Sequence, residues 1–263
     1  MQIDNVTETV VKSNDLIQSR HGLSLTEQKA ILYVISKIKR TDTELEPYEF
    51  SLKDFCAVCG YDRSGRAYSE IRAMLKGLRD RSWWQQLPDG SEVTCSWLAK
   101  VKLDYSAGSV LVELDRDLKP HLLQLKQKFT EYQLKHCLAF RSRYSMRLYE
   151  FVCSIHFHPL ESLQWNFTLE KLREVLGAEH YTAWKSLKQR ALDVAVQEIN
   201  TYSNKRISYT CKKQGRSVVG IELFINPEDG IETLQSEIRA NQRLYESEQL
   251  EGQQNLFDNL GAG

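Results

Sequence analysis

The stretch Trp184-Lys185-Ser186-Leu187-Lys188-Gln189-Arg190-Ala191-Leu192-Asp193 decides the fold of this 263-residue chain. It lies in a region that is predicted to be helical from Glu179 to Asn200. At about 100° per residue, the apolar residues of the helix form one stripe, which contains Tyr181, Trp184, Leu187, Ala191, Val194, Ala195 and Ile199. The opposite face is polar and contains Thr182, Lys185, Ser186, Gln189, Arg190, Asp193 and Gln197, with Lys188 at its edge.

The polar face carries residue types that can contact the edges of DNA bases. The major groove of B-DNA is wide enough for an α-helix. From such a helix, Arg or Lys can donate hydrogen bonds to guanine, and Gln can form hydrogen bonds with adenine. An ordinary solvated face is the alternative interpretation of any single polar helix. The candidate DNA-contacting residues on this helix are Thr182, Lys185, Ser186, Lys188, Gln189 and Arg190.

The flanking sequence favours the DNA-binding interpretation. A shorter helix precedes, beginning after Thr168 and ending at Gly177. Two alternating strands follow, Arg206 to Cys211 and Ser217 to Ile225, and the turn between them carries Lys212, Lys213 and Arg216. Helix, turn, helix and hairpin make a winged helix, a helix-turn-helix variant, and cations at the tip of the hairpin can bind phosphates.

The pattern occurs twice in the chain. Leu32-Tyr33 matches Leu148-Tyr149 at an offset of 116, and Phe50-x-Leu52 matches Phe167-x-Leu169 at an offset of 117. Tyr68-x-x-Ile71 also matches Tyr181-x-x-Trp184, at an offset of 113. Similarity at so long an interval predicts two related domains and not a solenoid.

The first half is predicted to begin with a helix at Leu25, since Ser24 and Glu27 can form a capping box. Ser51 caps a second helix, Gly60 ends it, and a third helix runs from Gly65 to Arg81. Two alternating stretches, 92–97 and 109–114, are predicted to pair as a hairpin. On the third helix Arg72 and Lys76 are exposed candidates for contacts to the DNA backbone, although packing against another protein is an equal alternative.

The expected fold is therefore α+β, with two tandem winged-helix domains related by an internal pseudo-repeat and an acidic C-terminal tail. We expect an N-terminal arm over 1–22, winged helices over 23–130 and 131–226, and a partly disordered tail over 227–263. The segment Lys119 to Phe140 is predicted to be a helical link between the domains.

The net charge of zero is the sum of opposite regions. Residues 132–226 have 14 basic and 8 acidic side chains, whereas residues 227–263 have 2 basic and 8 acidic ones. This segregation suggests the hypothesis that the tail shields the basic domain from non-specific DNA.

Other features favour a cytoplasmic protein with no membrane contact and no cofactor. No apolar run approaches the roughly 18–20 residues of a membrane span, and the first residues do not resemble a signal peptide. The six cysteines are expected to be free and mostly buried thiols, because the pair Cys56 and Cys59 has no second pair at zinc-site spacing and no His nearby.

A catalytic alternative rests on His156-Phe157-His158 and Tyr181. Rolling-circle nicking enzymes bind a metal ion with two such histidines and attack DNA with a tyrosine. The chemistry needs both imidazoles on one face of a strand, whereas this triplet ends a predicted helix over 142–155 and is followed by Pro159. We therefore expect no catalytic residues and no metal site.

Several linked motifs resemble the iteron-binding plasmid replication initiators. They are residues 10–17 (VVKSNDLI) with 23–29 (LSLTEQK), 140–150 (FRSRYSMRLYE), 187–193 (LKQRALD) with 198–200 (EIN), and 215–218 (GRSV). The resemblance covers roughly residues 8–226. One departure is Val194, where the family often has Pro, which suggests a straighter recognition helix in this chain.

The resemblance implies a tandem winged-helix initiator that binds directly repeated sites, called iterons, in double-stranded plasmid origin DNA. It also implies a homodimer formed through the N-terminal domain, repression of the protein's own gene, and recruitment of the host initiator and replicative helicase. The alternative is a tandem winged-helix transcription regulator with no initiator role.

Overall fold

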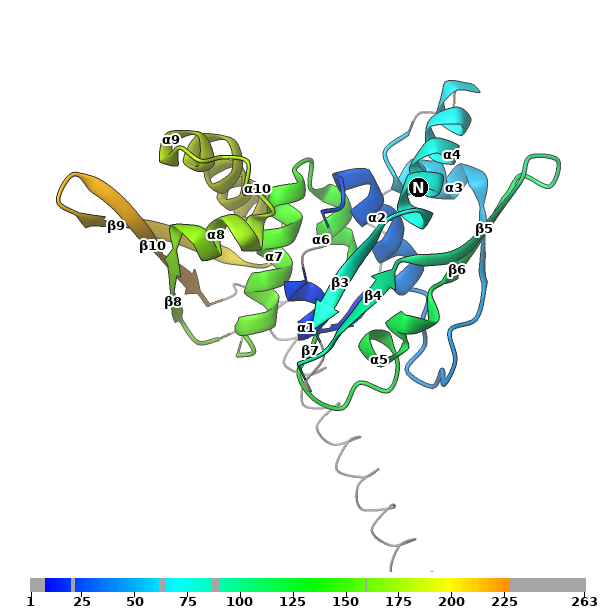
Figure 1. Cartoon of the computed structure of the whole chain (residues 1–263), viewed down its shortest axis with the longest axis horizontal. Coiled ribbons are helices and arrows are strands. Elements are labelled where there is room, and N and C mark those ends of the chain that lie inside the picture. The colour runs from blue at the N-terminus through cyan, green and yellow to red at the C-terminus, as the bar shows by residue number, and fades with distance from the viewer. Residues whose placement is uncertain (1–7, 20–21, 62–64, 87–89, 159, 228–263) are drawn as a thin grey trace, which may run out of the picture.

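A computed structural model describes residues 8–19, 22–61, 65–86, 90–158 and 160–227. Two winged helices lie side by side in it, the second on the left of Figure 1 and the first on the right. Helices α1 (Asn14–Gln18) and α7 (Arg143–Ile155) lie between them. The buried apolar residues of both halves form one continuous core, so the fold class is α+β, as predicted. The tail lies outside the described residues.

The first winged helix contains α2 (Leu25–Ile35), α3 (Leu52–Val58) and α4 (Gly65–Arg79). Its sheet has the order β2-β6-β5, formed by Tyr48–Ser51, Ser109–Leu114 and Leu98–Asp104. The predicted caps are confirmed. Ser24 and Glu27 form the capping box of α2, and the Ser51 side chain accepts a hydrogen bond from the backbone N–H of Asp54.

The second winged helix repeats this plan. Helix α7 is followed by β8 (Leu163–Thr168), α8 (Leu169–Leu176), a further helical segment from Trp184 to Tyr202, β9 (Arg206–Gln214) and β10 (Ser217–Asn226). The sheet order β8-β10-β9 is equivalent to β2-β6-β5, and this confirms the pseudo-repeat. The match of Tyr68 with Tyr181 is an exception, because Tyr68 lies inside α4 whereas Tyr181 precedes the helix.

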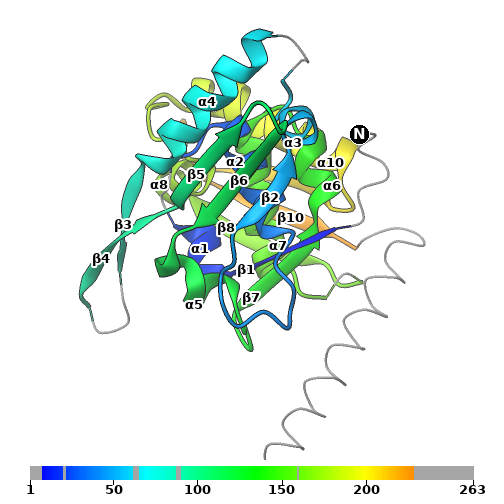
Figure 2. The ribbon, with the colours of Figure 1, turned by 90° about the vertical axis from the view of Figure 1, so that its right-hand side faces the viewer.

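The predicted hairpin of 92–97 with 109–114 is wrong. Strand β4 (Glu92–Ser96) pairs with β3 (Ser82–Gln86), and β6 pairs with β5 and β2. Figure 2 shows the β3–β4 hairpin extending away from the sheet. The error arose because two strands were missed. In β5 the alternation of Lys100 and Lys102 with Val101 and Leu103 was overlooked, and in β3 the adjacent Trp83 and Trp84 break the alternation.

A small joint connects the two winged helices. Strand β1 (Thr9–Ser13), within the predicted N-terminal arm, pairs with β7 (Phe129–Gln133). The predicted continuous helix from Lys119 to Phe140 is therefore wrong. The structure has η2 (Arg116–Leu118), α5 (Lys119–Leu122), β7 and α6 (Leu134–Ala139) in this region. Thr130 and Tyr132 are buried between half-buried neighbours, and this alternation in burial is that of a strand.

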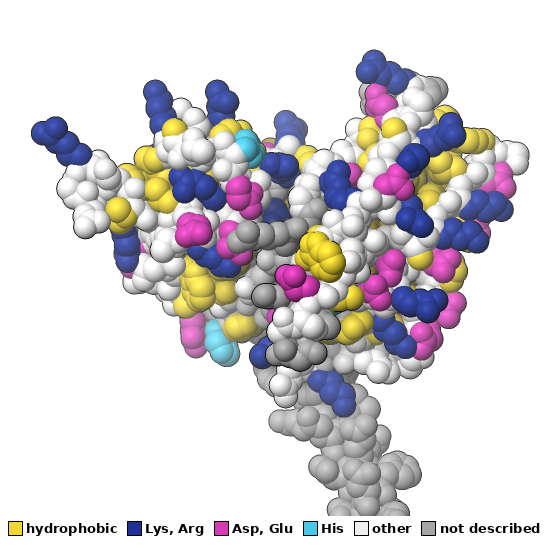
Figure 3. Space-filling view, in the orientation of Figure 1, with side chains coloured by type: hydrophobic (Ala, Val, Ile, Leu, Met, Phe, Trp, Pro, Cys, Tyr) yellow, Lys and Arg dark blue, Asp and Glu magenta, His cyan; other side chains and the backbone are white. Residues whose placement is uncertain are grey.

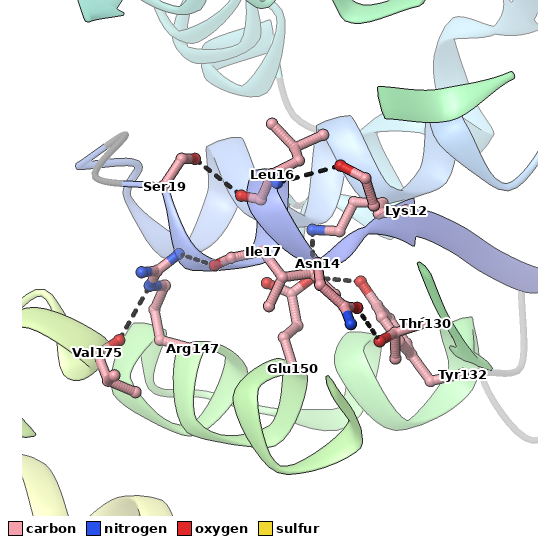
Figure 4. A network of polar contacts seen from close by, with 11 residues as sticks. Lys12, Asn14, Leu16, Ile17, Ser19, Thr130, Tyr132, Arg147, Glu150 and Val175 are labelled. Atoms are coloured by element: carbon pink, nitrogen blue, oxygen red, sulfur yellow. Dashed lines mark hydrogen bonds and ion pairs between the residues drawn. The ribbon is translucent and has the colours of Figure 1, made fainter. Parts of the chain in front are cut away.

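Buried polar contacts stabilise the joint (Figure 4). The Nζ of Lys12 lies 2.5 Å from the Oε1 of Glu150, and the Tyr132 hydroxyl also donates to that carboxylate. The Arg147 guanidinium donates to the carbonyl of Ile17 at 2.9 Å and to that of Val175 at 3.1 Å. Helix α7 is thus bound through charged groups to the N-terminal segment, the β1–β7 pair and α8.

Candidate nucleic-acid interface

Arg173 stabilises the turn between α8 and the helical segment that begins at Trp184. Helix α8 begins at the Thr168 cap and ends at Gly177, whose left-handed backbone (φ 62°, ψ 40°) suits glycine. The guanidinium of Arg173 then donates to the carbonyls of Tyr181 at 2.9 Å and Thr182 at 2.8 Å. The helix begins at Trp184 and not at Glu179, because these carbonyls are directed to Arg173 instead of continuing a helix. Thr182 consequently lies in the turn.

We call the segment from Trp184 to Tyr202 the recognition helix. It consists of α9 (Trp184–Leu187), a π-helical turn η3 (Lys188–Leu192) and α10 (Asp193–Tyr202). The helix is thus irregular even without the proline that the resembling family often has. Its buried side is formed by Leu187, Ala191, Leu192, Ala195 and Ile199, and Trp184 packs partly buried against the core.

The predicted polar face is on the outside of this helix. Lys185, Gln189 and Arg190 are exposed, as is Thr182 in the preceding turn, whereas Ser186 and Lys188 are half-buried. Within the described part of the chain, neither Lys185 nor Arg190 has an acidic partner at ion-pair distance. These two cations are therefore available to a ligand.

The β9–β10 hairpin is the wing. Gly215 forms its tip with a positive φ of 60°, and Lys212, Lys213 and Arg216 are all exposed there. The Nζ of Lys212 lies 3.9 Å from a carboxylate oxygen of Glu222 on the neighbouring strand. Figure 3 shows basic side chains projecting along the upper edge of the molecule, over the recognition helix and the wing. The recognition helix and the wing thus present basic side chains along one edge of the second domain.

Two contacts fix the base of the wing. The Asn200 side chain exchanges two hydrogen bonds of 2.8 Å with the backbone of Ile207, which joins the end of α10 to the start of β9. Strand β10 approaches β8 so closely at Gly220 that a Cβ there would lie 2.2 Å from the carbonyl oxygen of Phe167. Only glycine fits this approach.

A third contact, which sequence reasoning missed, joins the middle of the recognition helix to the wing. The Nζ of Lys188 lies 2.7 Å from the Oδ2 of Asp193, and the Tyr209 hydroxyl on β9 donates to Oδ1 at 2.5 Å. These hydrogen bonds raise the pKa of Lys188. Partial burial alone would raise the pKa of Asp193, but the bonds from Lys188 and Tyr209 lower it. Burial and the bond to Asp193 raise the pKa of Tyr209 to about 12.

The candidates of the first domain lie apart from this group. Arg72 and Lys76 are exposed on α4, which is at the upper right of Figure 1. Lys76 forms an ion pair with Asp80, and Arg66 pairs with Glu70 at 2.8 Å on the same helix. Much of the positive charge of α4 is therefore balanced locally.

The histidine triplet does not have the geometry of a nicking centre. His156 is buried: its Nε2 donates to the Glu161 carbonyl at 2.7 Å, and its Nδ1 accepts from the Nζ of Lys205 at 3.2 Å, whereas His158 is exposed. The two imidazoles therefore have different surroundings, and Tyr181 lies in the turn before α9. Within the described ranges, no three His, Cys, Asp or Glu side chains are grouped as metal ligands would be.

All six cysteines are free, and all but the half-buried Cys211 are buried. Across the residues that the structure describes, no helix has both the length and the apolar character of a membrane span.

Comparison with known protein families decides the assignment. The family model described as the first winged helix (WH1) of initiator replication proteins matches residues 9–153, and the model of the second winged helix (WH2) of initiator Rep proteins matches residues 168–225. The chain belongs to the initiator replication protein family. The WH1 match extends through α7 and covers the β1–β7 joint.

A replication initiation protein of Escherichia coli is 27% identical to this chain over 215 residues, which cover 79% of this chain and 66% of that protein. This chain thus spans just under two thirds of that relative. The Pi initiator protein, solved in complex with iteron DNA, superposes with a TM-score of 0.70. That match covers 86% of this chain and all of the other at 18% identity, so it shows a shared fold.

Proposed function

We propose that this protein initiates plasmid replication by binding direct repeats in double-stranded origin DNA, with the recognition helix in the major groove and the wing on the phosphates. One observation carries the proposal: Lys185, Gln189 and Arg190 are exposed on the recognition helix, and Lys213 and Arg216 are exposed on the wing that contacts this helix through Tyr209. The family assignment supports a role in initiation, and the Pi initiator, which shares the fold, is known in complex with iteron DNA.

The first winged helix has a different part in this proposal. It forms the homodimer and supplies backbone contacts through Arg72 and Lys76, and the protein recruits the host initiator and the replicative helicase in the cytoplasm. It also represses its own gene. No cofactor and no catalytic residue of this chain takes part, because opening the origin follows from binding and recruitment.

Footprinting on the DNA that flanks the gene tests the proposal. We expect protection of short direct repeats beside an A·T-rich stretch, with the major groove of each repeat protected on one face of the double helix. Protection of a single inverted repeat alone would indicate a transcription regulator instead. A covalent Tyr181 adduct, formed on single-stranded origin DNA with Mg²⁺ or Mn²⁺, would indicate the nicking chemistry that the position of His156 disfavours.

A further inference from the structure

Three side chains connect the recognition helix to the wing: Lys188 and Asp193 on the helix, and Tyr209 on β9. Both oxygens of the Asp193 carboxylate are used, one by the Lys188 ammonium at 2.7 Å and the other by the Tyr209 hydroxyl at 2.5 Å. The Lys188 ammonium also lies 5.9 Å from the centre of the Tyr209 ring. We call this triad the latch.

The latch depends on the π-helical turn. In a regular α-helix, residues three or four positions apart face each other, and residues five apart do not. The backbone N–H of Asp193 bonds to the carbonyl of Lys188, five residues earlier, and this widened turn places the two side chains on one side. The π turn and the latch thus support each other, at the position where Gln189 and Arg190 are presented.

We propose that the latch sets the angle between the recognition helix and the wing, so that both elements reach one DNA register. The inference rests on the proposed function. In it Lys188 is a positioning residue and not a phosphate contact, because its ammonium is already bound to Asp193. The wing is hinged at its base by Asn200 and Ile207, and a contact halfway along the strand fixes the direction in which Lys213 and Arg216 point.

Loss of the latch has a distinctive expected effect. An ion pair whose side chains are about 40% and 39% exposed contributes little to folding, so the variants fold. Binding to the correct repeat requires helix and wing together and falls about tenfold, as expected for coupled groups in one network. Binding to random DNA does not fall, because phosphate contacts need no fixed register and Lys188 is set free.

The experiment uses the full chain with Tyr209→Phe, which removes only the hydroxyl, and Asp193→Asn, which also releases Lys188. Affinity is measured for a duplex carrying the footprinted repeat and for a random duplex, over a range of salt concentrations. We expect each variant to lower the ratio of specific to random affinity about tenfold, and the double variant to lower it no further. Thermal unfolding confirms that each variant is folded.

Lys188→Ala distinguishes the two possible roles of that lysine. As a positioning residue, it lowers specific binding and leaves the salt slope on random DNA unchanged. A uniform loss on both duplexes, with a slope smaller by about one, would show a phosphate contact and overturn the inference. So would an unchanged specificity ratio in Tyr209→Phe and Asp193→Asn.

Arg190→Ala serves as the reference variant for the proposed function. If the wild type prefers the repeat and Arg190→Ala loses that preference while the latch variants keep it, the inference fails and the function stands. A wild type with no preference for any flanking sequence would overturn the function and the inference together.

Discussion

The two winged helices share one frame but differ in where their charges lie. At the offset of 116, Ile31 and Val34 of α2 correspond to Arg147 and Glu150 of α7, and all four side chains are buried. The first domain uses apolar side chains at these positions, whereas the second uses charged groups that reach β1, β7 and α1. Equivalent helix positions thus form part of an apolar core in the first domain and part of the joint between the domains in the second.

Helix α4 of the first domain and the recognition helix of the second differ in how their exposed cations are paired. On α4, Lys76 and Arg66 pair with acidic neighbours one turn away. On the recognition helix, Lys188 pairs with Asp193, whereas Lys185 and Arg190 have no acidic partner among the described residues. On α4 the same holds for Arg72 within the described residues. The two domains thus share one backbone plan and differ in the use of charge: buried charged residues of α7 connect the domains, and exposed cations of the recognition helix stay available to a ligand.

The largest effect is expected at the joint. Glu150→Ala removes one partner of a buried ion pair and leaves the Lys12 ammonium uncompensated, so we expect a loss of about 3–5 kcal/mol of unfolding free energy, measured by urea denaturation. The double variant Lys12→Met/Glu150→Met leaves no buried charge and is expected to recover most of this loss. Equal destabilisation by the single and double variants would show that the ion pair is not the cause.

The next largest difference in stability is expected where β10 and β6 pair with the capping residues Thr168 and Ser51. Gly220 pairs with Thr168 in the second domain as Ser109 pairs with Ser51 in the first. Gly220→Ser places a Cβ against the Phe167 carbonyl and is expected to cost about 1–3 kcal/mol. Ser109→Gly is the matched change in the first domain and should cost only roughly 0.5–1 kcal/mol. Thermal unfolding of both variants measures these losses in unfolding free energy. Equal losses in the two variants would contradict the expected contrast.

The proposed division of labour in DNA binding is tested by two arginines. Arg190→Ala is expected to cost about 1–3 kcal/mol on the correct repeat and much less on random DNA. Arg72→Ala, on the equivalent helix of the first domain, should weaken both duplexes by the same smaller amount. Competition binding measures both, and an equal loss on the two duplexes in Arg190→Ala would remove its base-reading role.

A smaller effect is expected at the wing. Lys213→Ala removes an exposed cation that we assign to phosphate, so binding should weaken similarly on every sequence and the salt slope should fall by about one. Binding titrations at several salt concentrations measure the slope. A change confined to the correct repeat would instead place Lys213 against a base.

The smallest effect is expected from the acidic tail. If residues 231–263 compete with DNA for the basic second domain, their deletion should raise affinity for random DNA at low salt and have little effect at high salt. Fluorescence anisotropy with a random duplex measures this. Equal affinities of the two proteins at low salt would reject the shielding hypothesis.

Local signals in the sequence predicted much of this fold. The capping box of Ser24 and Glu27, the caps at Ser51 and Thr168, and the stop at Gly177 all act within a few residues, and the structure confirms them. The wing was predicted as well, because its strands adjoin a glycine turn. Exposure of Lys185, Gln189 and Arg190 followed from helical periodicity alone, although their contact with DNA stays a prediction.

The missed features depend on distant or irregular contacts. Strand β7 pairs with β1, about 120 residues earlier, and in its sequence the apolar residues Phe129 and Tyr132 are three positions apart, a spacing that also fits a helix. Lys188 and Asp193 are five residues apart, a spacing that regular helices do not bring together. Since only the π turn brings these two side chains together, the latch was not predictable from periodicity.

The pairing of β1 with β7 has a consequence for how such proteins diversify. Residues 9–13 form a two-stranded sheet with residues 129–133, and Lys12 forms a buried ion pair with Glu150. A genetic crossover in the middle of the gene would separate two parts that share one interior. We therefore expect a new target preference to evolve by replacing exposed residues of the recognition helix, and a viable chimera to inherit its opening strand together with its C-terminal half.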